Sequence, residues 1–254
     1  MSSRRIRVDL AYDGTDFEGF QLQARGRTVQ GTVEEVLTRL ASGRLVRLRA
    51  ASRTDSGVHA RRQVVDGLID TRLDDRGLER ALTGLLPPDV RATRVSTVPE
   101  TFHSMHQAVA KTYRFQVDLS RHGDPLIARY AVHHAGRFER ARVEHGLALL
   151  SGRRDFTGFA DSRCRVLERV RDLSRAEWLP VDEARGFFVF RADGFLTYMV
   201  RNMVGTLFEV ARGAMPVEAI PEILETRDRR LGAATAPARG LCLWDVEYPS
   251  DGHG

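Results

Sequence analysis

Residues 196–211 carry the most regular hydrophobic pattern in this sequence of 254 residues. Apolar residues recur there every three or four positions, the spacing that places side chains on one face of an α-helix. They are Leu196, Met199, Val200, Met203, Val204, Leu207, Phe208 and Ala211. The pattern predicts a helix packed into a core, with Arg201 at the edge of the apolar face. One turn later, Gly205 leaves room for the guanidinium or for close packing.

Shorter patterns along the chain predict a mixture of strands and helices. Alternation of polar and apolar residues is typical of a half-buried strand, and spacings of three and four are typical of a helix. Strands are expected at residues 5–12, 45–52, 64–69, 90–98, 111–117 and 186–192, and helices at residues 29–40, 78–85, 138–150 and 196–211. We therefore expect a mixed α/β protein of the α+β class. Its two halves are expected to be residues 1–105 and 106–254.

A polar stretch at the end of one expected strand is a candidate site. The strand pattern gives way to Arg53, Thr54 and Asp55, and Ser56-Gly57 then supplies a turn. A carboxylate on such a loop, between an arginine and a glycine turn, is held where a substrate can reach it. The alternative is structural, because aspartate commonly bonds its own backbone in an Asx-type turn.

The composition favours a nucleic-acid partner in a reducing compartment. The formal net charge is +5, and Lys111 is the only lysine among 39 basic residues. A basic protein suits a polyanion, and arginine binds phosphate with planar, two-pronged geometry, although a GC-rich genome produces the same skew. Cys164 and Cys242 have no metal-ligand spacing, and no apolar run approaches the length of a membrane span. We expect a cytoplasmic protein.

Several segments resemble the motifs of one enzyme family. Residues 53–60, Arg-Thr-Asp-Ser-Gly-Val-His-Ala, followed by Gln63-Val64, closely resemble the active-site signature of tRNA pseudouridine synthases of the TruA type. Further resemblances lie at residues 12–15, 19–23, 102–103, 113–115, 155–159, 195–205 and 236–243. The resemblance spans nearly the whole chain and is weakest at residues 104–107 and 160–175.

The resemblance implies roles for three residues, and the chemistry of the reaction suggests one for a fourth, Arg53. Asp55 falls on the family's catalytic aspartate, and Arg201 on the arginine that pairs with it. Tyr113 falls on the active-site tyrosine, which stacks on the base, although the strand pattern alone favours a core position for Tyr113 and Phe115. Arg53 could fill the space that a flipped base leaves, because a base inside a helix cannot be reached.

The family's fold consists of two similar αβ halves around an extended, mainly antiparallel sheet with a central active-site cleft. The resemblance implies isomerisation of uridine to pseudouridine in the anticodon stem-loop of tRNA, at positions 38, 39 and 40. This reaction requires no metal and no redox cofactor. Family members form homodimers in which one tRNA contacts both subunits, so a homodimer is expected here.

Residues 104–107 depart from the family pattern. Met105 stands where the family commonly carries an arginine, and His106 and Gln107 follow it. This departure bears on which uridines and which tRNAs are modified. Two other functions stay open at this point. One is a metal-dependent nuclease with Asp13, Asp16 and Asp55 as ligands, and the other is a non-catalytic RNA-binding module.

Overall fold

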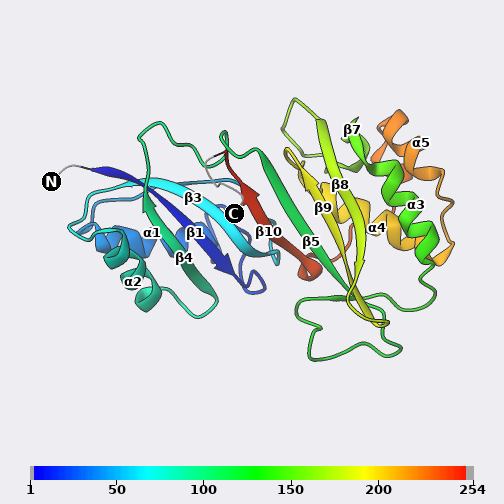
Figure 1. Cartoon of the computed structure of the whole chain (residues 1–254), viewed down its shortest axis with the longest axis horizontal. Helices are drawn as coiled ribbons and strands as arrows, with labels where there is room; N and C mark the ends of the chain where they lie inside the picture. The colour runs from blue at the N-terminus through cyan, green and yellow to red at the C-terminus, as the bar shows by residue number, and fades with distance from the viewer. Residues whose placement is uncertain (1–2, 250–254) are drawn as a thin grey trace. The chain divides into compact units, whose positions relative to one another are not determined.

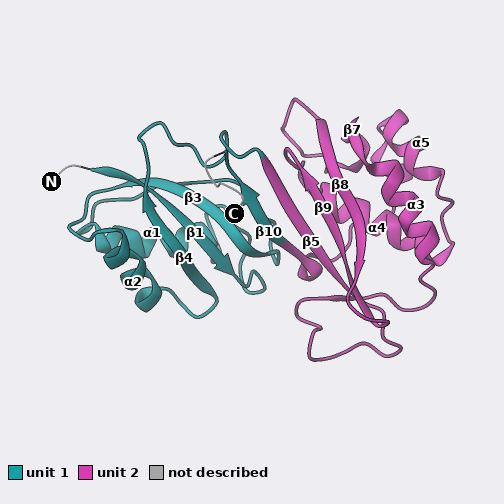
Figure 2. Ribbon diagram, viewed as in Figure 1, with its two compact units in different colours: residues 1–109, 243–254 teal, residues 110–242 magenta. Residues whose placement is uncertain are grey.

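The computed structural model describes residues 3–249, which form two compact units (Figure 2). Unit 1 contains the residues up to Val109 and those from Leu243 onward, and unit 2 contains Ala110–Cys242. The end of the chain therefore belongs to the same unit as its beginning. The units are groups of residues in mutual contact, and the division into folding halves at 1–105 and 106–254 stays a prediction.

Unit 1 is a sheet accompanied by two helices (Figure 1). Its strands lie in the order β4-β1-β3-β10, with β2 also paired to β3. Strands β1, β2, β3 and β4 form antiparallel pairs, in which Val8 faces both Val65 and Val95. The elements are β1 (Arg4–Tyr12), α1 (Val29–Leu40), β2 (Leu48–Ala50), β3 (His59–Ile69), α2 (Asp75–Leu85), β4 (Val90–Thr97) and β10 (Leu241–Glu247).

Local signals in the sequence explain both helices of unit 1. The side chain of Thr28 caps α1 by accepting a hydrogen bond from the backbone N–H of Gly31 at 3.2 Å, and Asp74 caps α2 in the same way. The apolar face of α2, with Leu78 and Leu82, is fully buried, and α2 packs along β4. Both predicted helices are confirmed.

Strand β1 differs from the half-buried strand that alternation predicts. Its apolar residues Ile6, Val8 and Leu10 are fully buried, but Arg7 and Asp9 on the other face are only 5% and 3% exposed. These two charges can be buried because Arg7 Nε donates to Asp9 Oδ1 at 2.8 Å. The expectation of one exposed face was wrong for this strand.

Unit 2 contains strands in the order β5-β9-β8-β7, with the short β6 parallel to β5. Strands β5, β9, β8 and β7 are joined by antiparallel pairs. Helix α3 contacts β8 and the helices α4 and α5 (Figure 1). The elements are β5 (Ala110–Asp118), β6 (Val132–His133), α3 (Arg140–Leu150), β7 (Gly152–Asp155), β8 (Val170–Pro180), β9 (Arg185–Ala192), α4 (Met199–Arg212) and α5 (Ala219–Thr226).

An aromatic cluster joins the sheet of unit 2 to its central helix. The rings of Phe115 on β5 and Phe188 on β9 both meet the ring of Phe208 on α4, with centroids 6.0 and 5.9 Å apart. Helix α4 begins at Met199, three residues later than the hydrophobic pattern predicts. Tyr198 just before it has a φ of 61°, in the left-handed region that non-glycine residues rarely adopt.

The expected fold class is confirmed: helices and mainly antiparallel strands form an α+β protein. No helix between residues 3 and 249 is long and apolar enough to cross a membrane.

Candidate active site

The loop that carries Asp55 connects β2 to β3 and is held at its base by β3. The N–H of Ala51 donates to the carbonyl of Val64 at 2.8 Å. The side-chain amide of Gln63, which is fully buried, then bonds both backbone groups of Ser52, at 3.2 and 2.7 Å. One buried amide therefore extends the strand pairing by a residue before the chain turns away.

Residues 12–20 hold the tip of this loop from the other side. The backbone N–H of Phe20 donates to the carbonyl of Thr54 at 3.0 Å, and the hydroxyl of Tyr12 lies 2.8 Å from that of Thr54. The Ser56 hydroxyl donates to the carbonyl of Phe17 at 3.1 Å. These contacts bring together two motifs that lie far apart in the sequence, at residues 12–23 and 53–60.

Gly14 shows how closely the two segments approach each other. A Cβ atom at this position would lie 2.0 Å from the carbonyl oxygen of Val58, a distance that no side chain tolerates. The N–H of Gly14 also donates to Nδ1 of His59 at 3.1 Å. The Asp13-Gly14 turn therefore shapes the loop that carries Asp55.

Arg53 is exposed, Thr54 is buried and Asp55 is half-buried. The expected turn at Ser56-Gly57 is present, and it closes through the backbone, with the N–H of Val58 donating to the carbonyl of Asp55 at 3.1 Å. A half-buried carboxylate on a loop fixed at both ends is suited to act on a bound substrate.

Asp13 has a local role in the loop that follows β1. Its carboxylate accepts hydrogen bonds from the N–H and hydroxyl of Thr15 at 3.0 and 2.6 Å, an Asx-type turn. Within the part of the chain that the structure describes, no three His, Cys, Asp or Glu side chains are grouped so that they could hold a metal ion. Asp13, Asp16 and Asp55 therefore do not form the ligand set that a metal-dependent nuclease would need.

Tyr113 lies near the start of β5 in unit 2. Its side chain is 6% exposed, and its ring meets that of Phe195 edge-on, with centroids 5.1 Å apart and planes at 88°. Phe115, two residues along on the same face, is fully buried against Phe208. Both aromatics of this strand are buried, as the strand pattern predicts, Tyr113 against Phe195 and Phe115 against Phe208.

Arg201 is fixed by the segment that follows α5. Its Nε donates to the carbonyl of Ala236 at 2.8 Å, and its own carbonyl accepts from the N–H of Ala236 at 3.1 Å. The guanidinium carbon lies 4.7 Å from the centre of the Tyr198 ring, within the range of a cation–π contact. The pattern of apolar residues indicated the position of Arg201 but not the contact with Tyr198. The only signal for Tyr198 was its place within the motif at residues 195–205.

Close packing is the reason for Gly205. A Cβ at this position would lie 2.0 Å from the carbonyl oxygen of Ala234, so residues 234–236 lie directly on the helix backbone. Asn202 reinforces the contact, because its side chain accepts from Thr235 Oγ1 at 2.7 Å and donates to the carbonyl of Phe159 at 2.8 Å. The motifs at 155–159, 195–205 and 236–243 therefore meet around one helix.

The segment that departs from the family pattern, residues 104–107, and Phe102-His103 before it are tied to β2 and β3. Asp66, which is fully buried, accepts from the N–H of Ser104 at 2.9 Å and from the Arg49 guanidinium. Burial alone would raise the pKa of Asp66, but these hydrogen bonds lower it. The rings of His103 and His106 lie 4.0 Å apart, and burial, followed by the charge of Arg49, lowers the pKa of His103.

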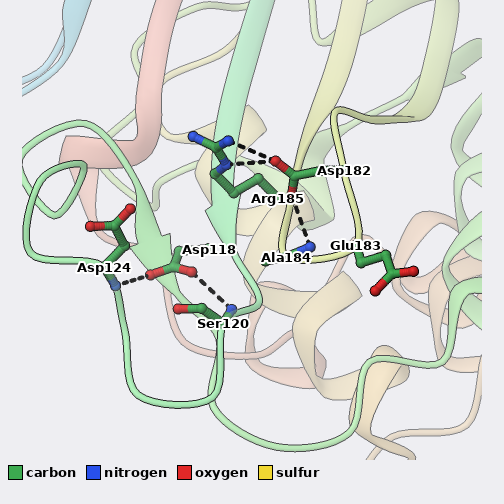
Figure 3. Close-up of a pocket in the computed structure, with 7 residues that line it drawn as sticks. All are labelled: Asp118, Ser120, Asp124, Asp182, Glu183, Ala184 and Arg185. Atoms are coloured by element: carbon green, nitrogen blue, oxygen red, sulfur yellow. Dashed lines mark hydrogen bonds and ion pairs between the residues drawn. The ribbon is translucent and has the colours of Figure 1, made fainter.

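A separate pocket of unit 2 lies at the far ends of β5 and of the β8–β9 hairpin (Figure 3). Several of its polar groups bond one another. Asp118 accepts from the N–H groups of Ser120 and Asp124 at 2.9 and 2.6 Å, and Arg185 pairs with Asp182 at 2.7 Å. None of the predicted site residues lines this pocket.

Of the four predicted site residues, Asp55 and Arg53 lie in unit 1, and Tyr113 and Arg201 lie in unit 2. Their roles in a reaction, and the pairing of Asp55 with Arg201, stay predictions from the family resemblance.

Comparison with known proteins identifies the family. The family model described as tRNA pseudouridine synthase matches residues 10–106 and 147–249, which include Asp55 and Arg201. The chain belongs to the tRNA pseudouridine synthase family. A relative from Streptococcus mutans named tRNA pseudouridine synthase A is 41% identical over 246 residues, covering 96% of this chain and 98% of that protein. A Geobacillus protein of the same name is 37% identical, covering 97% of this chain and 99% of that protein.

The family match covers the loop of Asp55 and its surroundings. The match of the family model includes the whole loop and the residues from Tyr12 to Phe20 that hold it. Residues 107–146, which include Tyr113, lie outside the match of the family model, whereas the alignments with the two relatives cover nearly the whole chain.

Proposed function

We propose that this protein is an isomerase that converts uridine to pseudouridine in tRNA, with Asp55 as the catalytic carboxylate. The observation that carries the proposal is the loop 51–58. It carries Asp55 and most of the family signature at residues 53–60, in which Ser56 is the one departure from the family pattern. Its two neighbouring segments hold Asp55 half-buried at a turn that closes through a backbone hydrogen bond. Neither the nuclease nor the RNA-binding alternative is favoured by an observation.

The reaction breaks the bond between ribose C1′ and N1 of uracil, turns the detached base, and forms a bond from C1′ to C5. The hydrogen on C5 leaves as a proton and N1 gains one, so no electrons are exchanged with a cofactor. An ionised Asp55 can attack the sugar as a nucleophile or can assist removal of a proton. Both steps need a carboxylate that a nucleotide can reach.

The other three residues receive supporting roles. Tyr113 stacks on the base, and its hydroxyl is suited to move a proton. Arg53, which is exposed, fills the space that the flipped base leaves. Arg201 holds the ionised form of the catalytic carboxylate, as the arginine of the family motif does.

The positions of the modified uridines are proposed from the family resemblance. We propose that the modified uridines lie in the anticodon stem-loop of tRNA, at positions 38, 39 and 40, and that the protein acts as a homodimer in the cytoplasm. Mapping pseudouridine in tRNA from cells with and without the protein tests the positions. Unmodified 38, 39 and 40 in both samples, or modification elsewhere, would refute this assignment.

The substitution Asp55→Asn tests the catalytic role. An amide has nearly the same shape but is a poor nucleophile, so we expect tRNA binding to be kept while single-turnover formation of pseudouridine falls by about 10⁴-fold. Asp16→Asn, an exposed aspartate on the preceding loop, is the matched control and should leave the rate unchanged.

Appreciable turnover by Asp55→Asn would show that another group performs the chemistry. Both proteins should be assayed with and without EDTA. Loss of wild-type activity in EDTA would instead support metal-dependent chemistry.

A further inference from the structure

Two cationic side chains emerge from one face at one end of the unit 2 sheet. Lys111 on β5 is paired with Ala192 on β9, which is also paired with Leu173 on β8. Directly paired residues of an antiparallel ladder share a face, and so do alternate residues of a strand. Arg171, two residues before Leu173, therefore shares the face of Lys111, and the two strands begin at the same end of the sheet.

The side chain of Arg171 crosses the end of β9. Its Nε lies 3.4 Å from the point where a Cβ of Gly194 would be, and its Nη1 donates to the carbonyl of Val170 at 2.6 Å. Within residues 3–249, neither Arg171 nor Lys111 forms an ion pair with a carboxylate. Asp193, whose charge acts on Lys111, accepts a hydrogen bond from the backbone N–H of Asp172 at 3.1 Å.

The electrostatics of Lys111 agree with this geometry. Burial, followed by the charge of Arg171, lowers its pKa to about 8 from the ordinary 10.5, while Asp193 acts in the opposite direction. A half-buried ammonium beside a guanidinium is unfavourable unless an anion joins them. Lys111 is also the only lysine in a chain that otherwise uses arginine. Lysine supplies a compact ammonium that binds phosphate as a point charge.

The two cations adjoin the tyrosine of the proposed site. Lys111 and Tyr113 are alternate residues of β5, about 7 Å apart along the strand. Gly194, under the Arg171 side chain, is followed by Phe195, whose ring meets Tyr113. One short loop, residues 193–195, thus lies against both Arg171 and Tyr113. An anion at Lys111 and Arg171 would lie within a nucleotide's length of a base at Tyr113.

We propose that Lys111 and Arg171 form a binding site for a phosphate of the RNA backbone next to the uridine that Tyr113 receives. This inference rests on the proposed function, and it assigns a substrate contact to two residues outside the four predicted ones. Phosphate recognition by paired cations fixes the position of the strand without reading its sequence. The site therefore serves any tRNA whose target uridine is presented to Tyr113.

Salt dependence of tRNA binding tests the contact. The variants are Lys111→Met, which keeps a long stem without charge, Lys111→Arg and Arg171→Met. The logarithm of the binding constant is plotted against the logarithm of the salt concentration. We expect each Met variant to weaken binding about tenfold at low salt and to reduce the slope by about 0.7 to 0.9, the loss of one phosphate contact. Lys111→Arg should recover most of the slope.

The matched control is Arg140→Met on α3, which also removes one positive charge from unit 2. Arg140 is exposed and pairs with Glu144 at 2.7 Å. The salt-dependence slope of Arg140→Met should equal that of the wild type. Thermal unfolding separates binding from folding, because removal of the Lys111 charge relieves its repulsion with Arg171. We therefore expect Lys111→Met to keep or raise the melting temperature while it weakens binding.

The lone lysine permits a direct test. An amine-selective acylating reagent can modify only Lys111 and the α-amino group of the chain. Saturating tRNA should slow acylation of Lys111 at least tenfold, and uridine nucleoside, which has no phosphate, should not. Mass spectrometry of the peptide that contains Lys111 measures the rate.

Unchanged salt slopes in both Met variants, together with unprotected Lys111 in the tRNA complex, would overturn the inference. The proposed function is tested separately by the wild-type protein. A wild type that forms pseudouridine, with Lys111 variants that bind like it, refutes only the phosphate site. A wild type that binds tRNA but forms no pseudouridine refutes the proposed function.

Discussion

Tyr113 has two proposed roles: its ring stacks on a base, and its hydroxyl moves a proton. Removing the hydroxyl alone tests the second role. Tyr113→Phe keeps the ring and its edge-on contact with Phe195, so stacking on a base should persist. If the hydroxyl moves a proton, single-turnover rate should fall by about a hundredfold or more while the dissociation constant of tRNA changes little. Rapid-quench assays and binding titrations measure the two quantities. Equal rates in the two proteins would leave Tyr113 as a stacking platform only.

The pKa of Lys111 gives a pH dependence with a definite sign. The folded-state pKa is lowered to about 8, so the ammonium that binds phosphate is fully present below that pH and is lost as the pH rises through it. Affinity for tRNA should therefore fall between about pH 8 and 9 in the wild type, more than in Lys111→Arg, whose guanidinium stays charged. Parallel curves for the two proteins would contradict a contact through Lys111.

The same shift has an opposite consequence for stability without RNA. Between about pH 8 and the ordinary pKa of 10.5, the unfolded chain holds a proton on Lys111 that the folded chain releases. The free energy of unfolding therefore rises with pH in this window as far as this group is concerned. A lysine placed where it costs stability is typical of a residue kept for binding.

At the scale of elements, helix α4 depends on the segment 234–236 that lies on it. Gly205→Ala would place a Cβ 2.0 Å from the carbonyl oxygen of Ala234, so we expect a loss of about 1–3 kcal/mol in the free energy of unfolding. Gly84→Ala in α2 is the control, because nothing lies within 4 Å of its added Cβ. That helix should gain about 0.4–1 kcal/mol. Denaturant titration measures both, and a neutral Gly205→Ala would show that the segment 234–236 moves away freely.

The start of α4 shows that hydrophobic periodicity does not determine the first residue of a helix. The apolar pattern continues back to Leu196, yet the helix begins at Met199. The carbonyl of Thr197 accepts from the N–H of Asp161 at 2.9 Å, and Tyr198 is left-handed. The carbonyl of Thr197 therefore bonds a residue that is distant in sequence, whereas in a longer helix it would accept a hydrogen bond from within the helix. Hydrophobic spacing records burial, and Leu196 is buried whether or not it is helical.

At the scale of the whole molecule, the proposed homodimer has a direct measurement. Sedimentation equilibrium should give a mass of about twice the 28.5 kDa of one chain at the concentrations used for activity. Titration with tRNA should then show how many tRNA molecules the dimer binds. A protein that is fully active at a monomeric mass would refute the need for a partner subunit.

The sequence by itself determined the features that depend on neighbouring residues and on recurring motifs. The caps of α1 and α2, the turn at Ser56-Gly57 and the helical faces are set within a few residues of chain, where local spacing carries the information. Family membership and the position of Asp55 were also readable, because the signature is a continuous run. Gln63 follows the signature and could be recognised from the sequence as part of the motif. The sequence did not show that its buried amide bonds the backbone of Ser52.

The tertiary structure decided which distant segments meet. It brought the end of the chain into unit 1, placed the carbonyl of Val58 against Gly14, buried Arg7 with Asp9, and set Arg171 over the end of β9 near Lys111. None of these contacts can be predicted from hydrophobic periodicity, because such a pattern indicates that a face is buried but not which segment covers it. Sheet pairing joins residues tens of positions apart, and only that pairing places the two cations on one face beside Tyr113.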